Sequence, residues 1–393
     1  MTNPFVIQRP IRYGEPFCDR EAEKKWLLKR ILGAEAVFLY SLRRYGKTSL
    51  VNQISGVLAS QGWETIFVDL TNVRKLEELA LVLKKALEKV YSSFWERLKG
   101  LTQKSPKMVF EMDPLTGKTS LSLKFEEKTV DIFTLETLLE RYLELPKHIE
   151  RPFLLVIDEF QEIRHFSPDG AVEGTFRKVF QRRDERLVPL FLGSRRRILK
   201  DMFESEKAPF YKGASPLELH EIPQKDYVAF VRKEFRKTLH FPVPENLLAK
   251  IWKLFGGHPY LGQKFAARLW TAVLLDKKVV LKELAIRLCV EIIEEEKQLY
   301  SLQNKRFPAY VLDLFEAIAE NEPVKRPFSK EFLKTTGLMT TEVQRGLRLL
   351  EEQDKVVKTQ EGWQVVDPSE RLWLRFRLYS EEEVAAWLEG FFS

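Results

Sequence analysis

A glycine, a lysine and a threonine stand together at Gly46, Lys47 and Thr48, between a short apolar run at 36–40 and an amphipathic stretch that begins at Lys47. In the spacing G-x-x-x-x-G-K-[ST], backbone N–H groups at a helix N-terminus hold phosphate oxygens, the lysine reaches the β- and γ-phosphates, and the hydroxyl ligates Mg²⁺. A chance occurrence in a lysine-rich chain is the alternative, and the strand-loop-helix context favours the phosphate loop. The residues that we expect to line this loop are Ser41, Arg43, Arg44, Tyr45, Gly46, Lys47, Thr48 and Ser49.

One position departs from the pattern, because Ser41 stands where the first glycine belongs. If the backbone there takes a glycine-type conformation, a side chain costs about 1 to 3 kcal/mol. The chemistry itself needs the later glycine, the lysine and the threonine, and all three are in place. We therefore expect ATP or ADP, with Mg²⁺, as the ligand of the loop.

Two adjacent acids, Asp158 and Glu159, follow a continuous apolar run at 153–157, the pattern of a strand buried on both faces. An acid at the end of such a strand lies beside the magnesium of a phosphate loop, and a second acid polarises the attacking water. Helix-capping acids are the alternative for this pair alone, but buried neighbouring carboxylates need a cation. We expect Thr48 and Asp158 to be the metal ligands.

Another apolar run, 188–193, ends in Ser194 and leads into arginines at Arg195, Arg196 and Arg197. At this strand end, Ser194 is expected to contact the γ-phosphate or the attacking water, and Arg195 to neutralise developing charge. Successive arginines on a helix point in different directions, so the others are expected in solvent. The expected catalytic set is Lys47, Asp158, Glu159, Ser194 and Arg195.

A parallel sheet is needed to bring these motifs together, and the first half of the chain predicts one, because short apolar runs alternate with longer helical segments. The predicted strands are 36–40, 65–70, 153–158, 188–193 and 217–221. The predicted helices between them are 47–60, 75–99, 132–143 and 175–183. Residues 107–128 break the alternation and predict an inserted β-hairpin. The fold class is therefore α/β, with the parallel core of a P-loop NTPase.

The remaining chain is helical and then changes pattern. Residues 224–300 predict helices only, with 291–297 as a charged, solvated face, and 309–366 predicts three short helices and a hairpin, the arrangement of a winged helix-turn-helix. The third of these helices is expected to begin at Thr340 or Thr341, with Gln344 completing a capping box. The expected domains are a core at 1–222, a helical domain at 223–303, a winged helix at 304–380 and a helical tail at 381–393.

Composition excludes several classes of protein. The 393 residues, 44% hydrophobic and 31% charged, are those of a folded globular chain with two or three domains. Two cysteines and five histidines favour neither a disulfide framework nor a zinc site. No apolar run reaches the roughly 20 residues that cross a bilayer, so we expect no membrane partner and a cytoplasmic location. The formal net charge of +7 permits nucleic-acid contact without requiring it.

Seven segments together carry a family resemblance: 3–5, 17–23, 43–50, 157–161, 193–194, 256–260 and 366–373. Over nearly its whole length the chain resembles the archaeal and bacterial P-loop ATPases of the STAND class, an AAA+-like group related in architecture to origin-recognition-type ATPases. The phosphate loop and acidic pair are common to many NTPases. Their combination with a double arginine and a Gly-Gly-His-Pro box is more specific.

The resemblance implies a core sheet of strand order 5-1-4-3-2, a helical lid and a C-terminal winged helix. It implies that Phe17 and Arg20 border the adenine, and that His258 and Pro259 contact nucleotide from the lid. It also implies that Ser194 and Arg195 occupy the sensor positions of the class. The chain departs from the family pattern at Ser41 and at Cys18-Asp19, which bears on the strength of nucleotide binding.

We therefore expect an ATP-binding, slowly hydrolysing switch whose nucleotide state sets the lid and winged helix, with self-association on ATP binding or a protein partner. A DNA-associated loader that uses its winged helix on duplex DNA is the main alternative. The presumed recognition helix mixes Arg345 and Arg348 with Glu342, Glu351 and Glu352, a combination that is poorly suited to binding DNA phosphates. The resemblance implies instead a winged helix that serves as an intramolecular regulator or a protein contact. A nucleotide-binding scaffold without turnover and a metabolic kinase fit the acidic pair and the domain pattern less well.

Overall fold

The computed structural model describes the chain except residues 1, 99–109, 113–118, 122–130 and 279. Its contacts divide the protein into two compact units, each described by itself below. Unit 1 comprises Met1–Arg20, Leu42–Ser49 and His220–Ser393, and unit 2 comprises Glu21–Ser41 and Leu50–Leu219. The domain boundaries expected at 222, 303 and 380 stay predictions.

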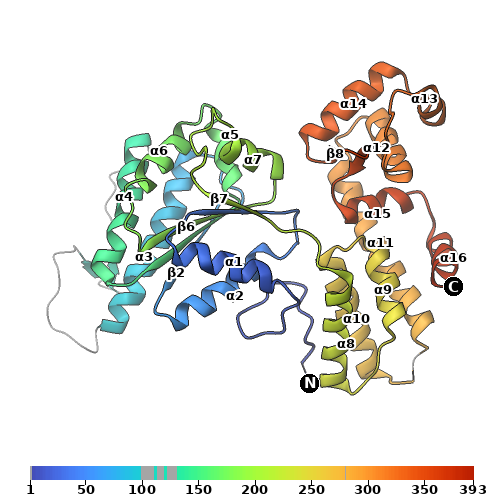
Figure 1. Ribbon diagram of the computed structural model, residues 1–393, viewed down its shortest axis with the longest axis horizontal. Helices are drawn as coiled ribbons and strands as arrows, with labels where there is room; N and C mark the ends of the chain where they lie inside the picture. Colours follow the sequence, from blue (N-terminus) through green and yellow to red (C-terminus); the bar gives the residue numbers. More distant parts are fainter. Residues whose placement is uncertain (1, 99–109, 113–118, 122–130, 279) are drawn as a thin grey trace. The chain divides into compact units, whose positions relative to one another are not determined.

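A five-stranded parallel sheet forms the centre of unit 2 (Figure 1). Along the sheet its strands are β2 (Glu64–Asp69), β5 (Phe153–Asp158), β6 (Leu187–Gly193), β1 (Val37–Tyr40) and β7 (Ser215–Glu218). Numbered by their order in the core, the strands run 5-1-4-3-2, which confirms the expected topology. Every residue of β1 and β6 is buried, because helices cover both faces of a parallel sheet.

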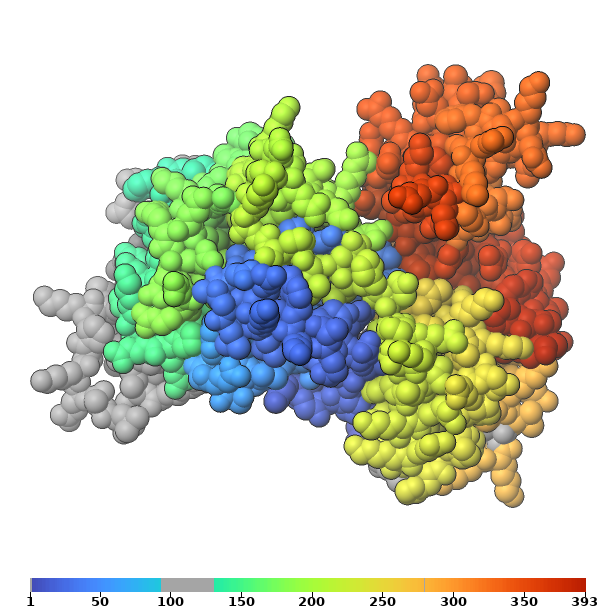
Figure 2. All heavy atoms as spheres, viewed as in Figure 1, coloured from blue at the N-terminus to red at the C-terminus, as the bar shows by residue number. Residues whose placement is uncertain are grey.

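Helices on one face of the sheet build the larger core of unit 2. Buried side chains of these helices share one hydrophobic cluster with Phe38, Leu155 and Phe191 of the strands. The helices of that cluster are α3 (Leu76–Leu98), α4 (Ile132–Ile149), α6 (Ala171–Phe180) and α7 (Arg196–Glu204). On the opposite side lie α1 (Glu21–Leu32) and the part of α2 (Lys47–Ser60) that belongs to unit 2. Glu21, Lys25 and Lys29 of α1 are exposed, and Figure 2 shows the N-terminal part of the chain, in blue, at the surface.

An inserted hairpin is present as expected, whereas several element bounds of unit 2 differ: β7 spans Ser215–Glu218 instead of 217–221, and α6 spans Ala171–Phe180 instead of 175–183. The hairpin strands β3 (Phe110–Met112) and β4 (Thr119–Leu121) pair antiparallel, and their predicted turn lies outside the described residues. Helix α4 extends to Ile149 instead of ending at 143, although it contains Pro146. Leu145 and Ile149 continue the buried stripe of this helix, so hydrophobic burial offsets the hydrogen bond that the proline cannot donate.

Four helices form the lid region of unit 1: α8 (Gln224–Leu239), α9 (Glu245–Leu254), α10 (Pro259–Leu275) and α11 (Leu281–Asn304). Their apolar sides share one core, which the C-terminal helix α16 (Glu381–Phe392) joins through Val384 and Leu388. The expectation that 291–297 forms a solvated face is wrong for Glu296, which is only 2% exposed. Its carboxylate lies 3.1 Å from the ammonium of buried Lys264, and this internal pair keeps the acid inside.

The winged helix of unit 1 has the predicted order of elements. They are α12 (Ala309–Asn321), α13 (Lys330–Thr336), α14 (Thr340–Glu352), the strands β8 (Val356–Lys358) and β9 (Trp363–Val365), and α15 (Pro368–Phe376). Helix α14 begins at Thr340 as predicted, but the expected threonine N-cap is wrong, because Met339 is the N-cap. The carboxylate that reaches back to its N–H, at 2.8 Å, belongs to Glu342 and not to the amide of Gln344.

Among the described residues, no helix is both long enough and apolar enough to cross a membrane.

Candidate functional site

Ser41 directly follows strand β1 and continues its backbone pairing with β6. Its side chain is fully buried, and its N–H donates to the carbonyl of Gly193 at 3.4 Å, one step beyond the β1–β6 ladder. Ser41 is not among the described residues with positive φ, so the cost of a side chain at a glycine position does not arise. The departure from the glycine pattern is therefore accommodated without backbone strain.

The loop after β1 takes its special backbone angles later, at Arg44 (φ 61°) and Gly46 (φ 89°). A side chain at Gly46 would meet no atom within 4 Å, so this glycine is required by its backbone angle and not by crowding. Lys47 is the first residue of α2, and its ammonium donates to the carbonyl of Leu42 at 3.3 Å. A lysine folded back across its own loop above a helix N-terminus is the arrangement that holds phosphate.

The other hydroxyl and cationic residues of the loop differ in their surroundings. Thr48 is half-buried, whereas Arg43 is exposed. Ser49 is buried, and its hydroxyl oxygen accepts the N–H of Ile11 at 3.0 Å. This contact attaches the N-terminal segment to the start of α2.

The N-terminal segment brings Phe17 and Arg20 into the same unit as the loop. Phe17 is partly exposed, while Arg20 is only 3% exposed and donates to the carbonyl of His220 at 2.6 Å. Asp19 and Arg20 both have positive φ, at 55° and 70°. The segment therefore makes a sharp turn where the family pattern has a glycine.

Two loop residues contact the lid within unit 1. The Arg44 guanidinium lies 4.4 Å from the ring centroid of Tyr260 and 3.9 Å from the carboxylate of Glu296. The ring of Tyr45 packs edge-on against His258, with centroids 5.1 Å apart. Sequence reasoning placed Arg44, Tyr45 and His258 near nucleotide, and the structure brings these three into one cluster.

Each ring nitrogen of His258 has a polar neighbour. Its Nδ1 accepts the N–H of Leu261 at the start of α10, and its Nε2 lies 3.8 Å from Asp367, the N-cap of α15. Pro259 follows as the first residue of α10. Burial lowers the pKa of His258, while Asp367 opposes that shift. The ring is therefore neutral near pH 7, and since Nδ1 accepts, the proton is on Nε2.

In unit 2, the two acids stand at the end of β5. The N–H of Glu159 donates to the Asp158 carboxylate at 2.9 Å, and Glu159 itself has φ 52°. The Glu159 carboxylate accepts from the Ser194 hydroxyl at 2.9 Å, from the Ser194 N–H at 3.3 Å and from the amide of Gln161. Of the two predicted acids, Glu159 is therefore held in place by three hydrogen-bond donors.

The close approach of Gly193 and Gln161 beside Glu159 was not predicted from the sequence. A Cβ on Gly193 would lie 2.1 Å from the Gln161 carbonyl oxygen and 2.5 Å from a methyl of Leu199. Gln161 is 1% exposed and directly follows Phe160, whose ring packs 4.5 Å from that of Phe191. The one sequence feature that could have indicated this contact is the glycine at the end of the strand, because a glycine there allows another residue to approach the backbone closely.

The three arginines after β6 have different surroundings, and the expectation that the arginines other than Arg195 lie in solvent is wrong for Arg196, which is half-buried. The Arg195 guanidinium is 3.1 Å from His165 in an exposed position. Arg196 instead binds Glu218 of β7 at 2.8 Å, and Arg197 is exposed. Arg195 is therefore an exposed cation that directly follows Ser194, the residue that binds Glu159. Arg196 stabilises the fold through its ion pair with β7.

A parallel five-strand sheet with a phosphate loop after β1, acids after β5 and a C-terminal winged helix defines a P-loop ATPase fold. The chain belongs to the family described as ATPase domain predominantly from Archaea, which matches residues 17–264, and a probable winged helix domain matches residues 296–376.

Solved structures with the same fold include the Walker-type ATPase Paby2304 of Pyrococcus abyssi, 21% identical, with TM-score 0.70 over 95% of this chain and 99% of that one. The ORC2 protein of Aeropyrum pernix, as ADPNP–ADP complexes, is 14% identical, with TM-score 0.57 over 99% of this chain and 98% of that one. A comparison with the curated proteins found no match.

Proposed function

We propose that the protein binds ATP with magnesium and hydrolyses it slowly. The observation that carries this proposal is the Glu159 carboxylate held by Ser194 at the carboxyl end of β5. Strands β1 and β5 are parallel in one sheet, so the chain leaves both at the same edge, and the phosphate loop is continuous with β1. The family membership supports the same activity.

In this proposal each site residue has one task. Lys47 and the N–H groups of the loop hold the phosphates, and Glu159 takes the proton of the attacking water. Thr48 and Asp158 offer oxygen donors, which suit Mg²⁺, and the bound ion would neutralise phosphate charge. Ser194 orients Glu159, and the exposed Arg195 is available to meet charge that develops on the phosphate.

We propose further that nucleotide state controls the lid and the winged helix, as in a STAND-class switch. Support comes from the contacts of Arg44 and Tyr45 with Tyr260 and His258 inside unit 1. His258 in turn lies beside Asp367 at the start of α15. If phosphate binding changes the contacts of Arg44 and Tyr45, the change would therefore affect both the lid and the winged helix. Self-association on ATP binding is part of this proposal, because an arginine from a second copy would complete the charge neutralisation.

Calorimetric titration with ADP and a non-hydrolysable ATP analogue tests the binding half of the proposal. Wild-type protein should bind both with magnesium, and Lys47→Ala should lose the heat of binding. Lys85→Ala, which removes an exposed lysine of α3, is the matched control and should bind normally. Equal binding by all three proteins would overturn the assignment of the loop.

A further inference from the structure

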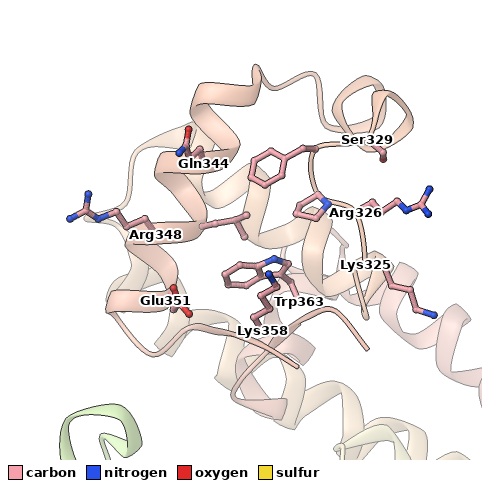
Figure 3. A pocket seen from close by; sticks show the side chains of 11 residues that line it. Lys325, Arg326, Ser329, Gln344, Arg348, Glu351, Lys358 and Trp363 are labelled. Atoms are coloured by element: carbon pink, nitrogen blue, oxygen red, sulfur yellow. The ribbon is translucent and has the colours of Figure 1, made fainter. Parts of the chain in front are cut away.

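The winged helix carries a hollow of about 700 Å³ between α14, the wing and the segment 325–329 (Figure 3). We call it the wing hollow. It lies entirely within the winged helix and takes no part in the chemistry proposed above. Its lining differs between its floor and its rim, and this difference indicates what it binds.

The floor of the wing hollow is apolar. Leu347 of α14, Trp363 of β9, Pro327 and Phe328 are the apolar residues of its lining, and we call these four residues the floor. Leu347 is 4% exposed, whereas Phe328 leaves 49% of its surface open to solvent. A large exposed aromatic side chain beside an apolar base is a feature of binding surfaces.

The rim of the wing hollow is cationic. Lys325, Arg326, Arg348 and Lys358 line it, against one carboxylate, Glu351. Figure 3 shows Arg326 and Arg348 extending on opposite sides of the hollow. Arg348 binds Glu352 at 2.9 Å but stays 82% exposed, and no ion pair joins the other three cations to a carboxylate in the described part of the chain. An occupant with negative charge on both flanks would match this rim.

Nucleic acid fits the floor and the helix less well than a peptide does. A buried base has polar edges that need hydrogen-bond partners, and besides the charged residues only Ser329, Gln344 and the indole N–H of Trp363 offer such groups in the lining. The lining of the hollow includes the carboxylate of Glu351, and Glu352 follows it at the end of α14, so both acids would repel phosphate. A hydrocarbon side chain needs no such partners and gains from burial.

We propose that the wing hollow binds an extended or helical peptide segment of a partner protein that carries a large apolar side chain between acidic residues. The apolar side chain enters the floor beside Phe328 and Trp363. The flanking carboxylates meet Lys325 and Arg326 on one side and Arg348 on the other. This proposal does not depend on ATP hydrolysis.

A random peptide library displayed on phage, panned on the full-length protein, tests the proposal. Enriched peptides are then synthesised with a fluorescent label and titrated by anisotropy against wild type, Lys325→Glu/Arg326→Glu and Phe328→Ala. Arg345→Glu is the matched control, because Arg345 is exposed on α14 but does not line the hollow. Labelled single-stranded and duplex DNA are titrated in parallel, and thermal melting confirms that every variant is folded.

We expect enriched peptides to be acidic with a central large apolar residue. Their Kd should rise about tenfold or more in both hollow variants and stay within about twofold in the control. Enrichment of peptides without this pattern, or equal affinity for the hollow variants and wild type, would overturn the proposal. DNA binding that the double charge reversal abolishes, with no acidic peptide bound, would make the hollow a nucleic-acid site instead.

Discussion

The Ser194 hydroxyl donates to the Glu159 carboxylate at 2.9 Å, although the two residues are 35 positions apart in the sequence. Glu159 follows β5 and Ser194 follows β6, and these strands are neighbours in the sheet. The contact fixes the direction of a half-buried carboxylate. It therefore connects the order of the strands to the residue that we propose as the base.

Removing the Ser194 hydroxyl should slow hydrolysis without weakening nucleotide binding. In Ser194→Ala we expect kcat to fall by about tenfold to a hundredfold, with KM nearly unchanged, because Glu159 keeps its charge but loses one of its donors. Steady-state ATPase kinetics measure this, and Ser194→Thr, which retains the hydroxyl, should restore most of the rate. An equal loss in both variants would contradict a positioning role.

Adding a single methyl at Gly193 should destabilise unit 2. The new Cβ would lie 2.1 Å from Gln161, so Gly193→Ala should cost roughly 1 to 3 kcal/mol in the free energy of unfolding. Urea denaturation measures the change. Gly174→Ala is the matched control, because its Cβ meets nothing within 4 Å and the residue lies inside α6, where alanine is the better helix former.

Glu296 and Arg44 should contribute unequally to stability. Glu296→Ala removes the buried partner of Lys264, a residue only 5% exposed, but leaves the ammonium its 2.7 Å contact with half-exposed Glu295, so it should cost about 1 to 3 kcal/mol. Arg44→Ala should cost less than about 1 kcal/mol, because the Arg44 side chain is 45% exposed. Denaturant melts of the two variants give the comparison, and similar losses would show that the loop-to-lid contact is stronger than its exposure implies.

Stability should fall in mild acid because of His258. Burial lowers its pKa in the folded protein, so the unfolded chain binds a proton first as pH falls. The contribution is present above the unfolded pKa of about 6.5 and decreases as the pH falls through that value toward the lower pKa of the folded state. His258→Asn keeps an N-cap side chain and should flatten the slope of unfolding free energy against pH. A slope equal to that of wild type would contradict the neutral, buried ring.

The strands and the positions of the motifs could be predicted from the sequence, because a short, continuous apolar run bounded by polar residues is typical of a strand buried on both faces. The run 153–157 predicted β5 and placed the acids at its end, which the structure reproduces. Site details that depend on residues distant in sequence were not predictable. Gln161 and Gly193 meet only because η1 (Phe160–Glu162) packs against the end of β6, and no local pattern encodes that approach.

Charge patterns were the least reliable guide. A cluster of acids at 291–297 has the composition of a solvated face, yet Glu296 is buried because Lys264 on α10 supplies the opposite charge. The N-cap of α14 shows the same limit at short range. Threonine is the better capping residue by type, but the N-cap is Met339, whose N–H donates to the carboxylate of Glu342.

Single-turnover hydrolysis of radiolabelled ATP by wild type and Glu159→Gln tests the central claim most directly. The variant should bind ATP as tightly as wild type and hydrolyse it about 10² to 10⁴ times more slowly, because the amide cannot take the proton of water. Filter binding on the same samples separates loss of binding from loss of chemistry. Hydrolysis by the variant at the wild-type rate would contradict the account.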